Sequence, residues 1–259
     1  MTPTLKVDSR LFWLAAQFRS SEPHMESINC VAVQPHPEKG VYIVALNGHM
    51  AGIAHDENGE ASQPFVLRVD KQTLNIIKPR RAPKRDKHQM PATLRLVDFD
   101  GAPRLAVYDG WENPLHVQLG SEPLAPWQYP DWMAAAYYNR VGKEPSTVLP
   151  LLPYRGLGEF ISAMTVYGAD NYEFKEVCVY PSESLDSAVF LRFGCAPEFL
   201  GVIMPLMEVS DAPTTTERRA APAWLKPHAS TPDPLVAPSV EMSAEAKPSM
   251  DDTEVGHAA

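Results

Sequence analysis

The chain has 259 residues, of which 44% are hydrophobic, and a formal net charge of −9. This length allows one large domain or two small ones, and the acidic balance argues against a protein that coats nucleic acid with its whole surface. The sequence has no run of eighteen apolar residues, and its first ten residues carry charge and contain no continuous apolar segment. We therefore expect a cytoplasmic protein that neither spans a membrane nor has a secretory signal.

The first predicted unit is a helix followed by strands. Asp8 or Ser9 can cap a helix whose apolar stripe has a 3.6-residue period. That stripe consists of Leu11, Leu14, Ala15 and Phe18. Strand-like runs follow at 27–34, 41–46 and 50–54. Asn47-Gly48 separates the last two and predicts a tight turn, because both residues tolerate positive φ.

The same order of elements recurs twice. In the second unit a strand at 65–69 precedes a helix that Asp70 caps and Pro79 ends, and strands follow at 93–98, 104–108 and 115–119. In the third, a helical stripe of Leu157, Phe160, Ile161 and Met164 precedes strands at 177–180, 188–193 and 201–206. A short helix is expected at 133–141 between these units. This alternation predicts an α+β fold in which helices cover one face of a continuous antiparallel sheet.

The last fifty residues differ in composition from the rest. From about Ser210 onward, Pro, Ala, Ser, Thr and acidic residues dominate, and apolar periodicity is absent. Such a segment buries too little apolar surface to offset its chain entropy, so residues 210–259 are predicted to form a disordered tail.

Signals for catalysis, metals and cofactors are missing from the sequence. It has no Walker loop and no GxGxxG, GxSxG or HExxH motif. Cys30, Cys178 and Cys195 form no CxxC pair and are expected to be buried small hydrophobes. We expect no catalytic residues, metal or cofactor, although a hydrolase built from scattered residues stays open.

Four stretches together resemble one known family. They are Val44–Ala51 with its Asn-Gly-His turn, Phe65–Lys78, the Tyr-Pro-Asp-Trp run 129–132, and the Val-Ile-Met-Pro run within 201–207. In order and spacing they resemble the bacterial β sliding clamp of DNA polymerase III and its shorter phage-borne relatives. Asn47, Leu46 and Met50 depart from the Asp, Thr and Arg of the family pattern.

The resemblance implies a DNA-clamp fold of repeated units, each with one helix packed on antiparallel strands. It divides the chain into a complete clamp-like domain at 1–128, a reduced second one at 129–209, and the tail at 210–259. It also implies a processivity factor, in which a homo-oligomeric ring tethers DNA polymerase and other proteins to duplex DNA without reading bases. A clamp loader is a further possible partner.

The resemblance also implies two sets of site residues. A peptide-binding groove would consist of Leu46, Gly48, His49, Met50, Ala51, Val202 and Met204. The residues Val202 and Met204 have an ordinary core interpretation as well, and Met50 is expected to tolerate a charged replacement. A DNA-proximal set would consist of Lys71, Lys78, Arg80, Arg81, Lys84 and Arg85, for which the alternative is a solvated basic loop. A shortened protomer also allows a second function, that of a non-ring protein that captures clamp-binding peptides or a host clamp.

Overall fold

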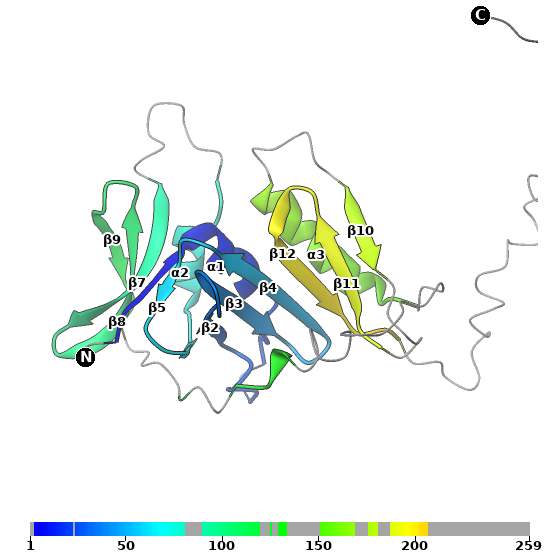
Figure 1. The fold of residues 1–259 in the computed structure, drawn as a ribbon, viewed down its shortest axis with the longest axis horizontal. Helices are drawn as coiled ribbons and strands as arrows, with labels where there is room; N and C mark the ends of the chain where they lie inside the picture. Colours follow the sequence, from blue (N-terminus) through cyan, green and yellow to red (C-terminus); the bar gives the residue numbers. More distant parts are fainter. Residues whose placement is uncertain are drawn as a thin grey trace, which may run out of the picture. The chain divides into compact units, whose positions relative to one another are not determined.

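The fold is described from a computed structural model, in which the described residues are 3–22, 24–80, 90–119, 125, 129–133, 151–168, 176–180 and 187–206 (Figure 1). All of them belong to one unit of the chain, Met1–Thr215. The predicted tail, most of the predicted helix at 133–141, and the basic residues Arg81, Lys84 and Arg85 lie outside the described residues.

The described residues form two antiparallel sheets. The five-stranded sheet has the order β5 (Glu60–Ala61), β1 (Leu5–Asp8), β7 (Pro91–Phe99), β8 (Ala102–Asp109) and β9 (Pro114–Val117). The seven-stranded sheet has the order β10 (Val177–Tyr180), β11 (Val189–Phe193), β12 (Ala196–Ile203), β4 (Met50–Asp56), β3 (Val41–Leu46), β2 (Val31–Pro35) and β6 (Phe65–Leu67). The α+β class and the repeated helix-and-strand units are confirmed.

The expected single continuous sheet is wrong. The strand that precedes each of the first two helices pairs with strands of the other unit. Strand β1 precedes the first helix but pairs with β7, while β6 precedes the second helix but pairs with β2. The two units therefore exchange one strand each, and the strands form two separate sheets. Strand β12 pairs directly with β4, so the seven-stranded sheet runs across the predicted domain boundary at 128/129, which stays a prediction.

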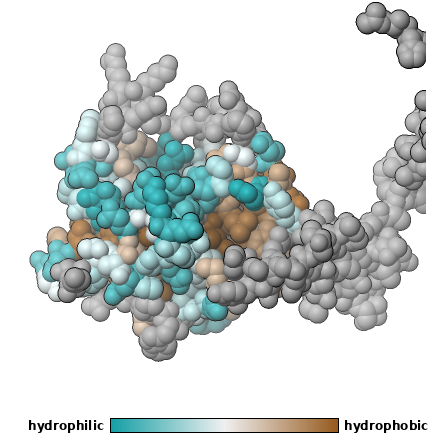
Figure 2. Space-filling model, in the orientation of Figure 1, coloured by the Kyte–Doolittle hydropathy of each residue, from teal (hydrophilic) through white to brown (hydrophobic). Residues whose placement is uncertain are grey.

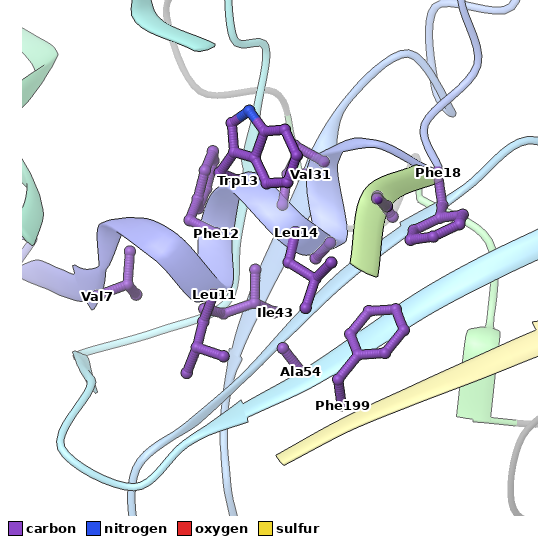
Figure 3. Close-up of a cluster of buried hydrophobic side chains, with 14 of the residues drawn as sticks. Val7, Leu11, Phe12, Trp13, Leu14, Phe18, Val31, Ile43, Ala54 and Phe199 are labelled. Carbon is purple, nitrogen blue, oxygen red and sulfur yellow. The ribbon is translucent and has the colours of Figure 1, made fainter. Parts of the chain in front are cut away.

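Three helices lie in the described part of the chain: α1 (Ser9–Ala16), α2 (Lys71–Ile77) and α3 (Tyr154–Tyr167). Asp8 caps α1 by accepting hydrogen bonds from the amides of Arg10 at 2.8 Å and Leu11 at 2.9 Å. Helix α1 packs on β3 and β4 of one sheet and on β7 of the other. Because it lies between two sheets, nearly all of its surface is buried rather than a single stripe, as the side chains around it show (Figure 3).

A pair of glycines lets two helices approach the seam between β4 and β12. Gly52 and Gly201 are partners in that antiparallel register. Over them the ring of Phe18, which follows α1, stacks on the ring of Phe160 from α3 with centroids 4.3 Å apart. A Cβ on Gly201 would lie 2.5 Å from Phe160 Cε1, so the missing side chain makes room for this stack.

Several local expectations differ from the structure. Strands β1 and β5 were not expected, and β2 begins at Val31 rather than at Ser27. Ile161 is 60% exposed, because α3 turns Phe160, Ala163, Met164 and Tyr167 inward instead. Cys178 is exposed on the edge strand β10, whereas Cys30 is buried and Cys195 half-buried. Within the described residues, no helix combines the length and apolar character needed to cross a membrane.

Candidate functional site

The site begins at the turn between β3 and β4. Asn47 Oδ1 accepts hydrogen bonds from the amides of His49 at 3.0 Å and Met50 at 2.9 Å. Gly48 has φ of +90°, a conformation that L side chains rarely adopt. The turn therefore holds His49 outward, at the end of two paired strands.

Strand β12 brings the second part of the site beside this turn. Ile203 is the register partner of Met50, and the next residue, Met204, donates its amide to the carbonyl oxygen of His49 at 2.8 Å. Residues about 150 positions apart in the sequence thus become neighbours. The Asn-Gly-His turn and the Val-Ile-Met run therefore lie side by side at the same end of two paired strands, not on opposite sides of the molecule.

The third part is the segment 129–133, which is fixed to the outer face of the seven-stranded sheet. The Tyr129 hydroxyl donates to the Val44 carbonyl at 3.1 Å, and Trp132 Nε1 donates to Gln34 Oε1 at 3.1 Å. Burial raises the pKa of the Tyr129 phenol, so the hydroxyl keeps its proton for this bond. The buried hydrophobic residues form two clusters: a main core on the helix side of the seven-stranded sheet, and a second cluster on its opposite face. Both aromatic rings belong to the second cluster.

These three segments enclose one pocket of about 210 Å³. It is lined by Leu46, Gly48, His49, Met50, Ala51, Ile53, Pro130, Asp131, Trp132, Val202 and Met204. All seven residues predicted for the groove are among them. The volume is below the roughly 300–1,000 Å³ of typical small-molecule sites and suits one or two apolar side chains. On the face seen in Figure 2, hydrophobic residues gather over the region of β11 and β12.

The pocket also contains residues that the sequence prediction did not assign to it. Pro130, Asp131 and Trp132 belong to the Tyr-Pro-Asp-Trp run, which contributed to the family resemblance but was not assigned to the groove, and Ile53 was not singled out at all. The signal that would have found the first three was the Tyr-Pro-Asp-Trp run itself. Two aromatic residues around a proline, in a segment without strand or helix periodicity, require a surface against which to pack.

The predicted groove residues differ in accessibility. Gly48, His49 and Met204 are exposed, whereas Val202 is 5% exposed within the second cluster. Met50 is only 9% exposed, and its Sδ would lie 3.0 Å from a Cβ on Gly156 of α3. The expectation that Met50 tolerates a charge is therefore wrong, because its side chain packs in the main core.

The described basic candidates lie elsewhere, on and after α2. Lys71 is exposed at the start of this helix, and Lys78 is exposed at its C-cap. Arg80 is also exposed, and its Nη2 donates to the Asn75 carbonyl at 3.1 Å. Helix α2 packs on β7 in the five-stranded sheet, so these residues form a group separate from the pocket.

The described residues do not form a metal centre. Among them no three His, Cys, Asp or Glu side chains come together as a metal site would require. Burial raises the pKa of the Cys30 thiol and of the half-buried Cys195 thiol, which disfavours the reactive thiolate at both.

Comparison with known proteins identifies the fold. The sequence matches no protein-family model and no curated protein sequence. The structure is similar to DNA polymerase III subunit β from Borrelia burgdorferi, solved in complex with a natural product, at a TM-score of 0.50 and 12% identity, over 80% of this chain and 64% of that one. Also similar are the DNA polymerase sliding clamp from Bacillus subtilis (TM-score 0.48, 11% identity, 83% and 67% covered) and the DNA polymerase β subunit from Streptococcus pyogenes (0.47, 12%, 82% and 66%).

The chain therefore has the fold of the DNA polymerase III β subunits, as the four sequence stretches predicted. It spans about two thirds of the length of these solved structures.

Proposed function

We propose that this protein is a sliding-clamp-like processivity factor, which tethers replication proteins to duplex DNA through the pocket at the β3–β4 turn. The partner would insert a short peptide with apolar side chains into the pocket. Peptides that bind to hydrophobic grooves of other proteins use apolar anchor residues in the same way. DNA would be held by contacts to its phosphates and not by base recognition. The active form would be a homo-oligomeric ring.

The observation on which this proposal rests is the composition of the pocket. Three segments separated by about 80 and 70 residues converge on it, and most of its lining is aliphatic or aromatic. The exposed Met204 adds a flexible side chain that adapts to differently shaped partners. A small, desolvated apolar pocket beside an exposed rim is the arrangement in which one or two anchor residues contribute most of the binding energy.

The charge distribution supports contact between DNA and the helices. The three described helices contain the basic residues Arg10, Lys71 and Arg155 and a single acidic residue, Glu159. The whole chain, in contrast, has 23 Lys and Arg against 32 Asp and Glu. The helices are thus less acidic than the rest of the molecule. The phosphates of DNA would attract the basic residues of the helices, while acidic residues elsewhere would limit nonspecific binding to nucleic acid.

Peptide binding tests the pocket most simply. The full chain is titrated into a fluorescently labelled synthetic peptide that contains a central Leu-Phe pair, and anisotropy is measured. Met204→Asp places a carboxylate on a residue that is 40% exposed, so the fold tolerates it, but a bound peptide would bury the charge. We expect at least a tenfold loss of affinity, which corresponds to about 1.4 kcal/mol.

Met25 offers a matched control. It is 38% exposed and belongs to the turn region before β2, away from the pocket, so Met25→Asp introduces the same charge at similar exposure. This variant should bind the peptide like the unaltered protein. Equal affinity of the Met204→Asp variant and the unaltered protein, or no peptide binding by the unaltered protein, would contradict the assignment of the pocket.

A second function is favoured by one observation, the reduced length of the chain. A protomer that spans about two thirds of the solved clamps covers less of a ring's circumference. The alternative is a non-ring protein of clamp fold, which captures clamp-binding peptides or a host clamp without encircling DNA. Retention on nicked circular DNA, with loss after linearisation, supports the ring, whereas equal behaviour on both DNAs supports the alternative.

A further inference from the structure

One wall of the pocket comes from the segment 129–133, which supplies Pro130, Asp131 and Trp132 to the lining. Among the described residues, this segment belongs to neither sheet. Hydrogen bonds from the side chains of Tyr129 and Trp132 connect it to the seven-stranded sheet instead. The position of this wall therefore depends on individual side chains, whereas the β3–β4 turn and the end of β12 are fixed by backbone pairing.

A cross-strand pair on the outer face of the sheet holds the indole of Trp132. Gln34 on β2 is the register partner of Tyr42 on β3, so their side chains lie side by side on one face. Gln34 Oε1 accepts the hydrogen bond from Trp132 Nε1 at 3.1 Å. The Tyr42 ring meets the indole edge-on, with centroids 5.2 Å apart, which is a favoured arrangement of aromatic rings. One polar and one aromatic contact thus fix the orientation of the indole.

The polar contact is the one that the indole cannot easily replace. Its nitrogen donates one hydrogen bond and accepts none. Trp132 is 6% exposed, so without the Gln34 oxygen this N–H group would be buried without a partner. The ring can avoid that cost by turning its nitrogen toward water, which moves the wall of the pocket. Gln34 is not one of the lining residues, so its replacement is expected to act on a bound peptide through Trp132.

We propose that Gln34 is a positioning residue of the pocket: by holding the indole of Trp132, it sets the wall against which one apolar anchor of a bound peptide packs. The inference rests on the proposed peptide-binding function and goes beyond it to the residue that shapes the site from outside. A wall that is already fixed loses little further freedom when a peptide binds, which favours affinity. Because one indole contacts part of a peptide, Gln34 should influence one anchor and not the peptide as a whole.

Three variants of the full chain separate this role from ordinary stabilisation. Gln34→Met keeps the length of the side chain but removes the oxygen, and Gln34→Glu keeps an oxygen that can accept the indole N–H. Thr73→Val is the matched control, because buried Thr73 Oγ1 donates to Gln118 Oε1 at 3.0 Å on the α2 side of the fold, away from the pocket. Gln34→Met and Thr73→Val each remove one side-chain hydrogen bond, so both should lower the thermal stability.

Peptide binding is then measured by anisotropy with three labelled peptides, which contain Leu-Phe, Leu-Ala or Ala-Phe as the central pair. Gln34→Met should bind the Leu-Phe peptide about two- to tenfold more weakly than the unaltered protein, the range expected for one aromatic contact. Gln34→Glu and Thr73→Val should bind it like the unaltered protein. The loss caused by Gln34→Met should persist with one of the two alanine peptides and disappear with the other, whose missing anchor is the one that packs on Trp132.

Nuclear magnetic resonance gives a second readout, the solvent exchange of the Trp132 indole proton, whose signal is identified by its loss in Trp132→Phe. Exchange should be faster in Gln34→Met than in the unaltered protein and unchanged in Thr73→Val. If Gln34→Met loses stability but binds all three peptides like the unaltered protein, or weakens all three equally, the positioning role is overturned and the peptide-binding function stands. If the unaltered protein binds none of the peptides, the proposed function fails, and this inference fails with it.

Discussion

The glycine pair at the seam between β4 and β12 allows a quantitative test of how the site is positioned. Gly201→Ala adds a Cβ that would lie 2.5 Å from Phe160 Cε1 and 3.0 Å from its Cδ1. Phe160 is only 1% exposed and stacks on Phe18, so its ring has little space into which to move. Added methylenes in a packed core cost about 1–3 kcal/mol.

Alanine in place of glycine also restricts the unfolded chain, which returns about 0.5–1 kcal/mol. Because Phe160 has little space into which to move, the packing cost should lie in the upper part of its range, at about 2–3 kcal/mol, and subtracting about 1 kcal/mol leaves a net loss of about 1–2 kcal/mol. For a protein of this length, each kcal/mol lowers Tm by roughly 2–4 °C, so a decrease of about 2–8 °C is expected. Urea unfolding followed by circular dichroism and thermal unfolding by calorimetry both measure it.

Gly158 provides the matched control for this substitution. It lies on the exposed side of α3, and a Cβ there would meet no atom within 4 Å. Gly158→Ala should therefore stabilise the protein by up to about 1 kcal/mol through helix propensity. Combining Gly201→Ala with Phe160→Leu should cost less than the sum of the two single changes, because the smaller side chain removes the clash. If Gly201→Ala were neutral or stabilising, the inferred packing of α3 on this seam would be refuted.

Two further predictions concern the helix cap and the basic residues. Burial raises the pKa of the Asp8 carboxyl above its usual 3.8, so the folded state binds this proton more tightly than the unfolded state, and the native protein loses stability as pH rises from 3.8 through the folded pKa. Asp8→Asn keeps a capping oxygen and should not show this loss. Asp8→Ala removes both the cap and the titrating carboxyl, and should cost about 1 kcal/mol below pH 3.8. Equal unfolding curves for both variants would argue against the cap. Replacing Lys71, Lys78 and Arg80 by Glu should weaken duplex binding and reduce the salt slope by about 0.9 for each lost phosphate contact, with Arg192→Glu on β11 as the control. An unchanged slope would mean that these residues do not contact phosphates.

Local signals in the sequence predicted most of the elements. The Asp8 cap and Asp70 cap, together with 3.6-residue periodicity, located α1 and α2, and the Asn47-Gly48 turn located the β3–β4 hairpin. These features depend on residues that are close in the sequence, so they can be recognised without knowledge of the tertiary structure. Strand β1 was not predicted, because it has only four residues and is followed directly by a helix.

Features that depend on distant neighbours were not predictable in this way. Whether the apolar stripe of α3 includes Ile161 or Ala163 depends on how far the helix is rotated against β12. The burial of Met50 depends on its contact with the start of α3, which no local pattern encodes. The exchange of β1 and β6 between sheets likewise reflects pairing over long sequence separations, which periodicity does not report.

The candidate pocket was predictable only through resemblance to a known family. Composition and periodicity alone assign Val202 to a core strand, which agrees with its low exposure. The same residue also lines the pocket, because β12 ends where the β3–β4 turn begins. The contribution of Asp131 and Trp132 became visible once Tyr129 and Trp132 were seen to be bonded to the sheet.

The mass of the full chain in solution tests the central claim most directly. A ring requires protomers to associate, and β9 and β10 each lie at an edge of a described sheet, where a strand of another copy could pair. Size-exclusion chromatography with light scattering at micromolar concentration should give one defined species, whose mass is a whole-number multiple, two or more, of 28.7 kDa. A single species of 28.7 kDa would contradict a topological tether and leave the non-ring function in its place.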